Sequence, residues 1–139
     1  MSETANCIFC KIVRGEIPAI KVHEDDHTLS FMDIQPASPG HLLVISRTHA
    51  ANLLDIAEAD LSAVTLATQR LARAVWKALE PDGVRINQFN GAAAGQSVFH
   101  YHVHIIPVWE GQRIGGHGRA PANPEELKAL AEKIRQARI

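Results

Sequence analysis

Hydrophobic residues recur at two different periods along this chain. Alternating or continuous apolar segments predict short strands over 20–24, 27–34, 41–46, 84–89 and 98–108. The segment 41–46 (HLLVIS) is almost wholly apolar and lies between Pro39-Gly40 and Arg47, which is typical of a buried central strand.

Two segments have the three- and four-residue steps of a helix. The first predicts a main helix over 58–80, ended by Pro81-Asp82-Gly83 and capped by Asp60, or by Asp55 with Glu58. The second predicts a helix over 123–138, with Asn123 as N-cap, Pro124 in the first turn and Glu126 completing a capping box. The order strands, helix, strands, helix predicts an α+β fold with an antiparallel sheet of about five strands.

Composition narrows the class of protein. A length of 139 residues fits one domain, and 46% hydrophobic with 21% charged residues is typical of a globular chain. A formal net charge of −1 gives no support for nucleic-acid binding. The longest apolar run is short and the start has no apolar signal segment, so we expect no membrane span and a cytoplasmic protein.

Histidine is the unusual residue, with eight copies against one Tyr. In the strand predicted over 98–108, His100, His102 and His104 share one face, because side chains alternate along a strand. Tyr101, Val103 and Ile105 then point the other way. Three imidazoles in such a row suit three kinds of chemistry: a metal site, general acid–base catalysis, or nucleophilic catalysis by one imidazole. In a metal site, Asp33 could add a carboxylate ligand.

The loop before this strand, Asn90 to Ser97 (NGAAAGQS), is built of small residues. Its N–H groups, with the Gln96 and Ser97 side chains, can approach an anion closely. On composition alone a plain hairpin loop remains an alternative. An anion cradle beside a nucleophilic imidazole favours phosphoryl or nucleotidyl transfer.

The pattern His100-Tyr101-His102-Val103-His104-Ile105-Ile106 resembles the histidine triad (HIT) superfamily, and the chain is similar to bacterial-type members of its Hint branch. The resemblance includes Gly95-Gln96-Ser97-Val98, Phe31-Met32-Asp33-Ile34, Pro39-Gly40-His41 and the start at Cys7. It covers roughly residues 5–109, which implies a single HIT domain over 1–139 with a C-terminal extension.

The resemblance implies a nucleotide-binding hydrolase or transferase that acts at the α-phosphate, usually as a homodimer. By position His102 is the nucleophile, His104 contacts the phosphate or leaving group, and His41 orients the triad. Gln96 and Ser97 stabilise phosphoryl charge, and Asp33 accepts hydrogen bonds from the ribose. The remaining nucleotide-binding positions are Phe9, Ile17, Phe31, Ile34, Asn90, Gly95 and Val98.

Two cysteines in a chain that we expect to be cytoplasmic argue against a structural disulfide. Their spacing, Cys7-x-x-Cys10, suits a redox pair or half a zinc site, and two buried thiols are the alternative. In family members with this start, a structural zinc is held by the positions of Cys7, Cys10, His49 and His100. This implies that His100 is structural, whereas His102 and His104 are catalytic.

The function implied first is hydrolysis of nucleoside phosphoramidates of AMP or GMP type. The alternatives are a dinucleoside polyphosphate hydrolase and a non-catalytic nucleotide-binding regulatory protein. His23, His27 and His117 have no assigned role, and Arg113 and Arg119 are candidate phosphate contacts. For a dimer, Ala67, Ala74 and Trp76 are candidate interface residues on the main helix.

Overall fold

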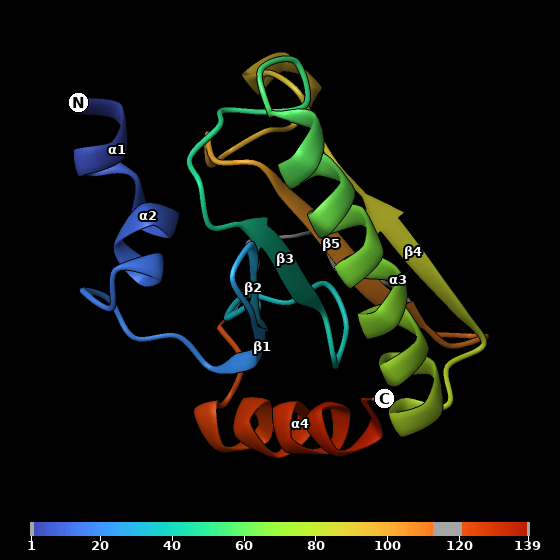
Figure 1. Cartoon of the computed structure of the whole chain (residues 1–139). Coiled ribbons are helices and arrows are strands. Elements are labelled where there is room, and N and C mark those ends of the chain that lie inside the picture. The colour runs from blue at the N-terminus through green and yellow to red at the C-terminus, as the bar shows by residue number, and fades with distance from the viewer. Residues whose placement is uncertain (1, 113–120, 139) are drawn as a thin grey trace.

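Five strands form one antiparallel sheet in the order β1-β2-β3-β5-β4 (Figure 1). The computed structural model describes residues 2–112 and 121–138. The strands are β1 (Lys21–Glu24), β2 (Thr28–Met32), β3 (Leu42–Ser46), β4 (Gly83–Asn87) and β5 (His102–Val108). The predicted α+β fold is therefore confirmed.

The register of the central strands decides which side chains share a face. Leu43 lies opposite His104, and Ile45 lies opposite His102. Because directly paired residues point to the same side of a sheet, the two histidines share their face with the apolar side chains of β3. Val103 and Ile105 lie on the opposite face, as the alternation predicts.

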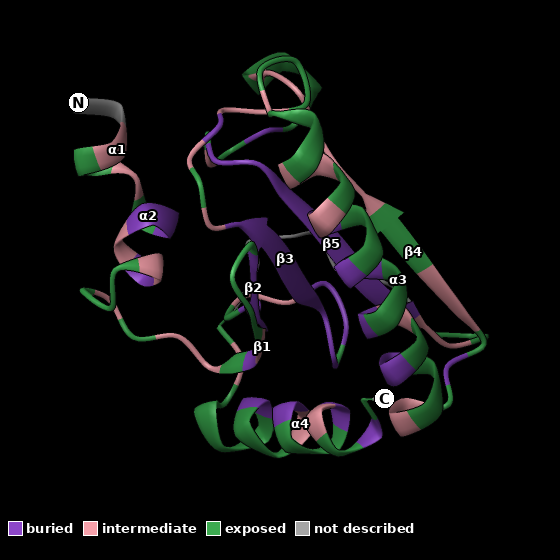
Figure 2. Cartoon of the chain, viewed as in Figure 1, coloured by how far each residue is buried: buried purple, intermediate pink, exposed green. Residues whose placement is uncertain are grey.

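Helices cover both faces of the sheet (Figure 1). The long helix α3 (Glu58–Leu79) and α4 (Pro124–Ala137) pack on one face, over the larger core cluster. On the other face lies α2 (Ile8–Val13), preceded by α1 (Ser2–Asn6); its Phe9 and Ile12 close a smaller cluster. In Figure 2, β3 is buried along its length, whereas the outer sides of α3 and α4 are exposed. The histidine face is thus enclosed by a two-turn helix.

The helix ends show which capping predictions were right. Asn123 accepts a hydrogen bond from the Glu125 N–H at 2.8 Å, as expected of an N-cap. The N-cap of α3 is instead Ala57, with no side-chain cap. Asp55 accepts N–H bonds from Ala51 and Asn52, so it organises the loop before the helix. Both predicted caps of α3 were therefore wrong.

Three other predictions need correction. The strand expected over 98–108 begins only at His102, because the Tyr101 N–H donates to the Ala50 carbonyl at 2.8 Å and leaves the sheet ladder. The apolar start after Cys7, for which no element was predicted, is the helix α2. Ala67 and Ala74 are buried in the core and cannot form a dimer surface; Trp76 is exposed.

Among the described residues, no helix combines the length and apolar character needed to cross a membrane. A short 3-10 helix, η1 (Ala92–Ala94), lies in the loop that precedes the histidines.

Candidate active site and metal cluster

A cavity of about 250 Å³ lies between α2, β2 and the histidine face of β5. Its walls are mostly apolar, with Asp33, Gln35, Ser97, His102 and His104 as the polar lining groups. A mostly apolar pocket with a few convergent polar groups is typical of a small-molecule site. The structure thus brings the expected nucleophile together with most of the expected nucleotide contacts.

His102 is held in one tautomer by the backbone. Its Nδ1 lies 2.6 Å from the His100 carbonyl oxygen, which can only accept, so Nδ1 carries the proton. In the neutral ring, Nε2 is then the nitrogen without a proton and carries the lone pair. The Phe9 ring packs edge-on against the imidazole, with centroids 5.1 Å apart, and fixes its plane. This arrangement suits a nucleophilic nitrogen.

His104 is held in the opposite tautomer by His41. The Ala37 N–H donates to His41 Nδ1 at 2.9 Å, so the proton of this neutral ring is on Nε2. That N–H lies 3.0 Å from His104 Nδ1, which must accept. The proton of neutral His104 is therefore on Nε2, and the residue is a hydrogen-bond donor beside the lone pair of His102.

Asp33 lies at the end of β2, on the wall of the same cavity. One carboxylate oxygen accepts the Gln35 N–H at 2.8 Å, and the other lies 3.5 Å from His41 Nε2. The carboxylate is thus fixed at a position from which it can accept hydrogen bonds from a ligand in the cavity.

The side-chain amides of Gln96 and Asn90 hydrogen-bond within the loop region. The buried Gln96 side chain donates to the carbonyls of Ala51 and Val98, at 2.6 and 3.0 Å, and accepts the Gly91 N–H at 2.8 Å. Asn90 accepts the Leu53 N–H at 2.8 Å and pairs with Gln88. These hydrogen bonds within the protein give Gln96 and Asn90 a role in shaping the loop, and the predicted part of each residue in nucleotide binding stays a prediction.

The other expected contacts are placed as follows. Ser97 is exposed and lines the cavity, together with Val98. The apolar lining includes Phe9, Ile17, Phe31 and the exposed Ile34. Gly95 has φ +110°, a backbone conformation that favours glycine, and a Cβ at this position would contact the Phe89 ring. Arg113, His117 and Arg119 lie outside the described residues.

Sequence reasoning missed several lining residues, chiefly because α2 was not predicted. Ile8 and Ile12 of this helix line the cavity beside Phe9. The spacing of Phe9 and Ile12, three residues apart, is the helical signal that could have identified them. Pro18, Ala19, Met32, Gln35 and Leu43 complete the lining and carried no such signal.

A second cluster brings together Cys7, Cys10, His49 and His100, whose potential ligand atoms all lie within 4.8 Å of one another. The Cys7 sulfur lies 3.3 Å from His100 Nδ1, and the Cys10 sulfur lies 3.2 Å from His49 Nδ1. Tetrahedral zinc with ordinary bond lengths places sulfur and nitrogen ligands about 3.6 Å apart. A zinc ion fits this set after shifts of a few tenths of an ångström.

The protonation states also fit a metal. His100 Nε2 donates to the Ser46 carbonyl at 2.6 Å, so the nitrogen that faces the sulfurs is bare. Burial, with smaller contributions from His49 and His102, lowers the pKa of His100 to about 4, so the ring is neutral at pH 7. Burial and the neighbouring Cys7 raise the pKa of Cys10 to about 11, so a bound metal has to displace its proton.

Asp33, His41 and His104 form another compact group of potential ligands. Here the tautomers argue against a metal. His41 uses Nδ1 to accept an N–H, so its proton is on Nε2, the nitrogen that faces the group. A metal at that nitrogen requires its deprotonation, and the group is better described as a hydrogen-bond relay.

The fold and the site together define a class of small α+β protein in which a strand with histidines at alternate positions lines an apolar ligand pocket. The family model of the HIT domain matches residues 14–111, and the chain belongs to this family.

Curated relatives match most of the chain. Protein hit of Bacillus subtilis is 42% identical over 93% of this chain and 92% of its own length. The adenosine 5'-monophosphoramidase hnt1 of Schizosaccharomyces pombe is 41% identical over 93% of this chain and 96% of its own length. The adenylylsulfatase HINT3 of Arabidopsis thaliana is 37% identical over 81% of this chain and 60% of its own length.

Solved structures of HIT family proteins have the same fold as this chain. A Hit-like protein of Bartonella henselae superposes with a TM-score of 0.88 and 45% identity, covering 95% of this chain and 96% of that one. A zinc-bound histidine triad family protein of Mycobacterium smegmatis has a TM-score of 0.85 and 35% identity, covering 96% and 94%.

Proposed function

We propose that this chain is a nucleotide hydrolase or transferase that acts at the α-phosphate of purine nucleotides, with nucleoside phosphoramidates as its substrates. The observation that carries the proposal is the pair of opposite tautomers at His102 and His104 on the wall of one cavity. One nitrogen has a lone pair for attack, and its neighbour has a proton for a phosphoryl oxygen.

In the first step His102 Nε2 attacks the α-phosphorus, the P–N bond of the substrate breaks, and the electron pair leaves with the amine, which takes a proton from water. In the second step water attacks the same phosphorus, the P–Nε2 bond breaks, and the water proton passes to solvent. His102 recovers its lone pair. Splitting one displacement into two in this way is the role of a nucleophilic side chain.

His104 Nε2–H and the Ser97 hydroxyl stabilise the negative charge that develops on the phosphoryl oxygens. Because His41 keeps a hydrogen on its Nε2 towards His104, a second proton on His104 Nδ1 would meet that hydrogen. His104 therefore acts as an uncharged donor, and His41 is a positioning residue.

The apolar part of the cavity is the slot for the purine base. Phe9 and Phe31 pack edge-to-face with centroids 5.4 Å apart and give it a rigid wall, and Ile17 and Ile34 complete it. Asp33 is the acceptor for the ribose hydroxyls. A base in this slot leaves the α-phosphate on the side of Ser97 and the histidines.

The cavity lining favours an amine over a polyphosphate as the leaving group. None of the described residues that line it is Lys or Arg, whereas a polyphosphate leaving group carries several negative charges. The similarity to the monophosphoramidase of S. pombe supports the same choice. The similarity to an adenylylsulfatase supports a second substrate class, in which sulfate leaves from the phosphorus.

The test compares turnover of adenosine phosphoramidate, diadenosine tetraphosphate and adenylyl sulfate by the wild type and His102→Ala. We expect fastest turnover of the phosphoramidate, loss of all activity in the variant, and an acid-labile nucleotidyl adduct visible by intact-mass spectrometry after rapid quenching. His27→Gln, which changes an exposed histidine, is the matched control. Unchanged hydrolysis by His102→Ala would refute the covalent mechanism, and a preference for the tetraphosphate would refute the substrate class.

We also propose that Cys7, Cys10, His49 and His100 hold a structural zinc ion. Such an ion would tie α2 to the segment just before β5 and so fix one wall of the cavity. The geometry of the four ligand atoms and the zinc-bound relative from M. smegmatis support this.

A cytoplasmic homodimer remains our proposal for the assembled protein. The edge strand β4 exposes the large apolar side chain of Ile86, and α3 exposes those of Leu66 and Trp76. Light scattering on the wild type and Trp76→Glu tests the dimer, and cell fractionation tests the location.

A further inference from the structure

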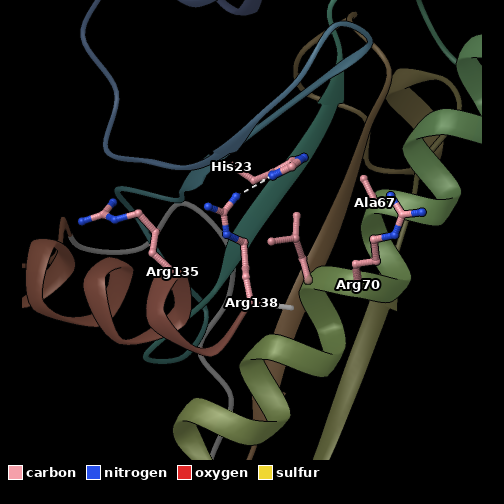
Figure 3. A pocket seen from close by; sticks show the side chains of 6 residues that line it. His23, Ala67, Arg70, Arg135 and Arg138 are labelled. Atoms are coloured by element: carbon pink, nitrogen blue, oxygen red, sulfur yellow. Dashed lines mark hydrogen bonds between the residues drawn. The ribbon is translucent and has the colours of Figure 1, made fainter.

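A groove on the opposite face of the sheet from His102 is not used by the proposed reaction. Its main cavity, of about 260 Å³, lies between α3, α4 and β1 and is lined by His23, Ala67, Arg70, Leu71, Arg135 and Arg138 (Figure 3). A second cavity of about 200 Å³ shares Arg70 and adds Arg73, Ala74 and Ala137. We call the two together the α3–α4 groove.

The α3–α4 groove concentrates positive charge in a chain whose formal net charge is −1. Four of its lining residues are arginines and none is acidic. Arg135 is paired with Glu132 at 2.7 Å. Within residues 2–112 and 121–138, the other three arginines, Arg70, Arg73 and Arg138, have no carboxylate at salt-bridge distance.

Arg138 has an unusual partner. Its guanidinium donates to His23 Nδ1 at 2.6 Å, and His23 Nε2 is 2.9 Å from Asp25. The His23 ring thus links the Arg138 guanidinium to Asp25 and holds the arginine side chain in place. Figure 3 shows Arg138 reaching from α4 to His23, with Arg70 and Arg135 on opposite sides.

The arrangement of the arginines suits an anion with several phosphate groups. Arg70 and Arg73 are three residues apart on α3, a spacing that places Cβ atoms about 5–6 Å apart on one side of a helix. Arg135 lies in the last turn of α4, and Arg138 directly follows the end of that helix. Guanidinium groups match phosphate oxygens with paired N–H donors.

We propose that the α3–α4 groove is a second binding site, specific for a short polyphosphate group, either free or as the phosphate chain of a larger molecule. Arg70 and Arg138 hold the anion from the two helices, and Arg73 extends the site. Because the groove and the His102 cavity lie on opposite faces of the sheet, both can be occupied together.

The test is isothermal titration of inorganic tripolyphosphate into full-length protein saturated with AMP, at about 0.15 M salt so that long-range attraction is screened. We expect one saturable site per chain. Arg70→Gln and Arg138→Gln should each weaken binding about tenfold, because each removes a guanidinium with paired N–H donors for the anion. Arg85→Gln, which removes an exposed arginine of β4, should leave the affinity unchanged.

Side-chain NMR of the arginine Nε–H groups locates the anion, with shifts expected at Arg70 and Arg138 and not at Arg85. Absence of saturable binding, or equal weakening by Arg85→Gln, would overturn the proposal. Titration with ATP separates the two sources, because tighter binding than tripolyphosphate with the same arginine dependence assigns the phosphate chain of a nucleotide. An oligonucleotide or acidic peptide that binds there more tightly than either would also overturn it in favour of a macromolecular partner.

Discussion

Replacing His100 should remove a pH-dependent part of the free energy of unfolding of the zinc-free protein. Burial lowers the pKa of His100 from 6.5 to about 4, with the Ser46 carbonyl acting in the opposite direction. The unfolded chain therefore takes up a proton on this ring at a higher pH than the folded protein does. As far as His100 is concerned, the free energy of unfolding is therefore highest above about pH 6.5 and decreases as the pH falls to 4.

The pKa difference corresponds to about 3 kcal/mol of stability lost across this range. The assay is urea unfolding in the presence of a chelator, at several pH values between 7 and 4, for the wild type and His100→Gln. The wild type should lose about 3 kcal/mol more than the variant as the pH falls. His27→Gln removes an exposed histidine and should follow the wild type.

Parallel pH curves for the wild type and His100→Gln would refute the assignment of a buried neutral ring. Zinc supplies a second check, because a ligand that binds only the folded protein raises its stability by mass action. Since the metal requires unprotonated His100, its stabilising effect should also fade as the pH falls towards 4.

Three further outcomes are expected. His104→Ala should lower turnover about 100- to 1,000-fold, the usual cost of one donor to a developing oxyanion, whereas His104→Gln, which keeps an N–H donor, should recover most of it in steady-state assays. Cys10→Ser should abolish stoichiometric zinc by metal analysis and lower the thermal midpoint, whereas Ser38→Ala, remote from the cluster, should keep the metal. Gln96→Ala should cost about 1–3 kcal/mol in urea unfolding because it leaves the Gly91 N–H unpaired; a loss of binding without a loss of stability would contradict its role in shaping the loop.

The sequence was sufficient for the sheet and for the sharing of one face by His102 and His104, because alternation along a strand is a local rule. It was insufficient at residues 98–101, since the hydrogen bond from Tyr101 to Ala50 joins segments that are far apart in the chain. The same limit applies to Gln96. The small-residue loop predicts that its side chain contacts an anion, whereas in the fold this side chain donates to the carbonyls of Ala51 and Val98. The orientation of an amide depends on which backbone groups lie around it, and no local pattern contains that information.

The three histidines of the motif have the same side chain at equal spacing, yet they differ in chemistry. The difference comes from the partner of one nitrogen in each ring. The Ser46 carbonyl leaves Nδ1 of His100 unprotonated, and the His100 carbonyl leaves Nε2 of His102 unprotonated. His104 is instead controlled by the side chain of His41. Since the two carbonyls belong to the backbone, replacing the side chains of Ser46 or His100 leaves these tautomers in place. His41 is instead the position at which a single substitution outside the motif can release the tautomer of His104.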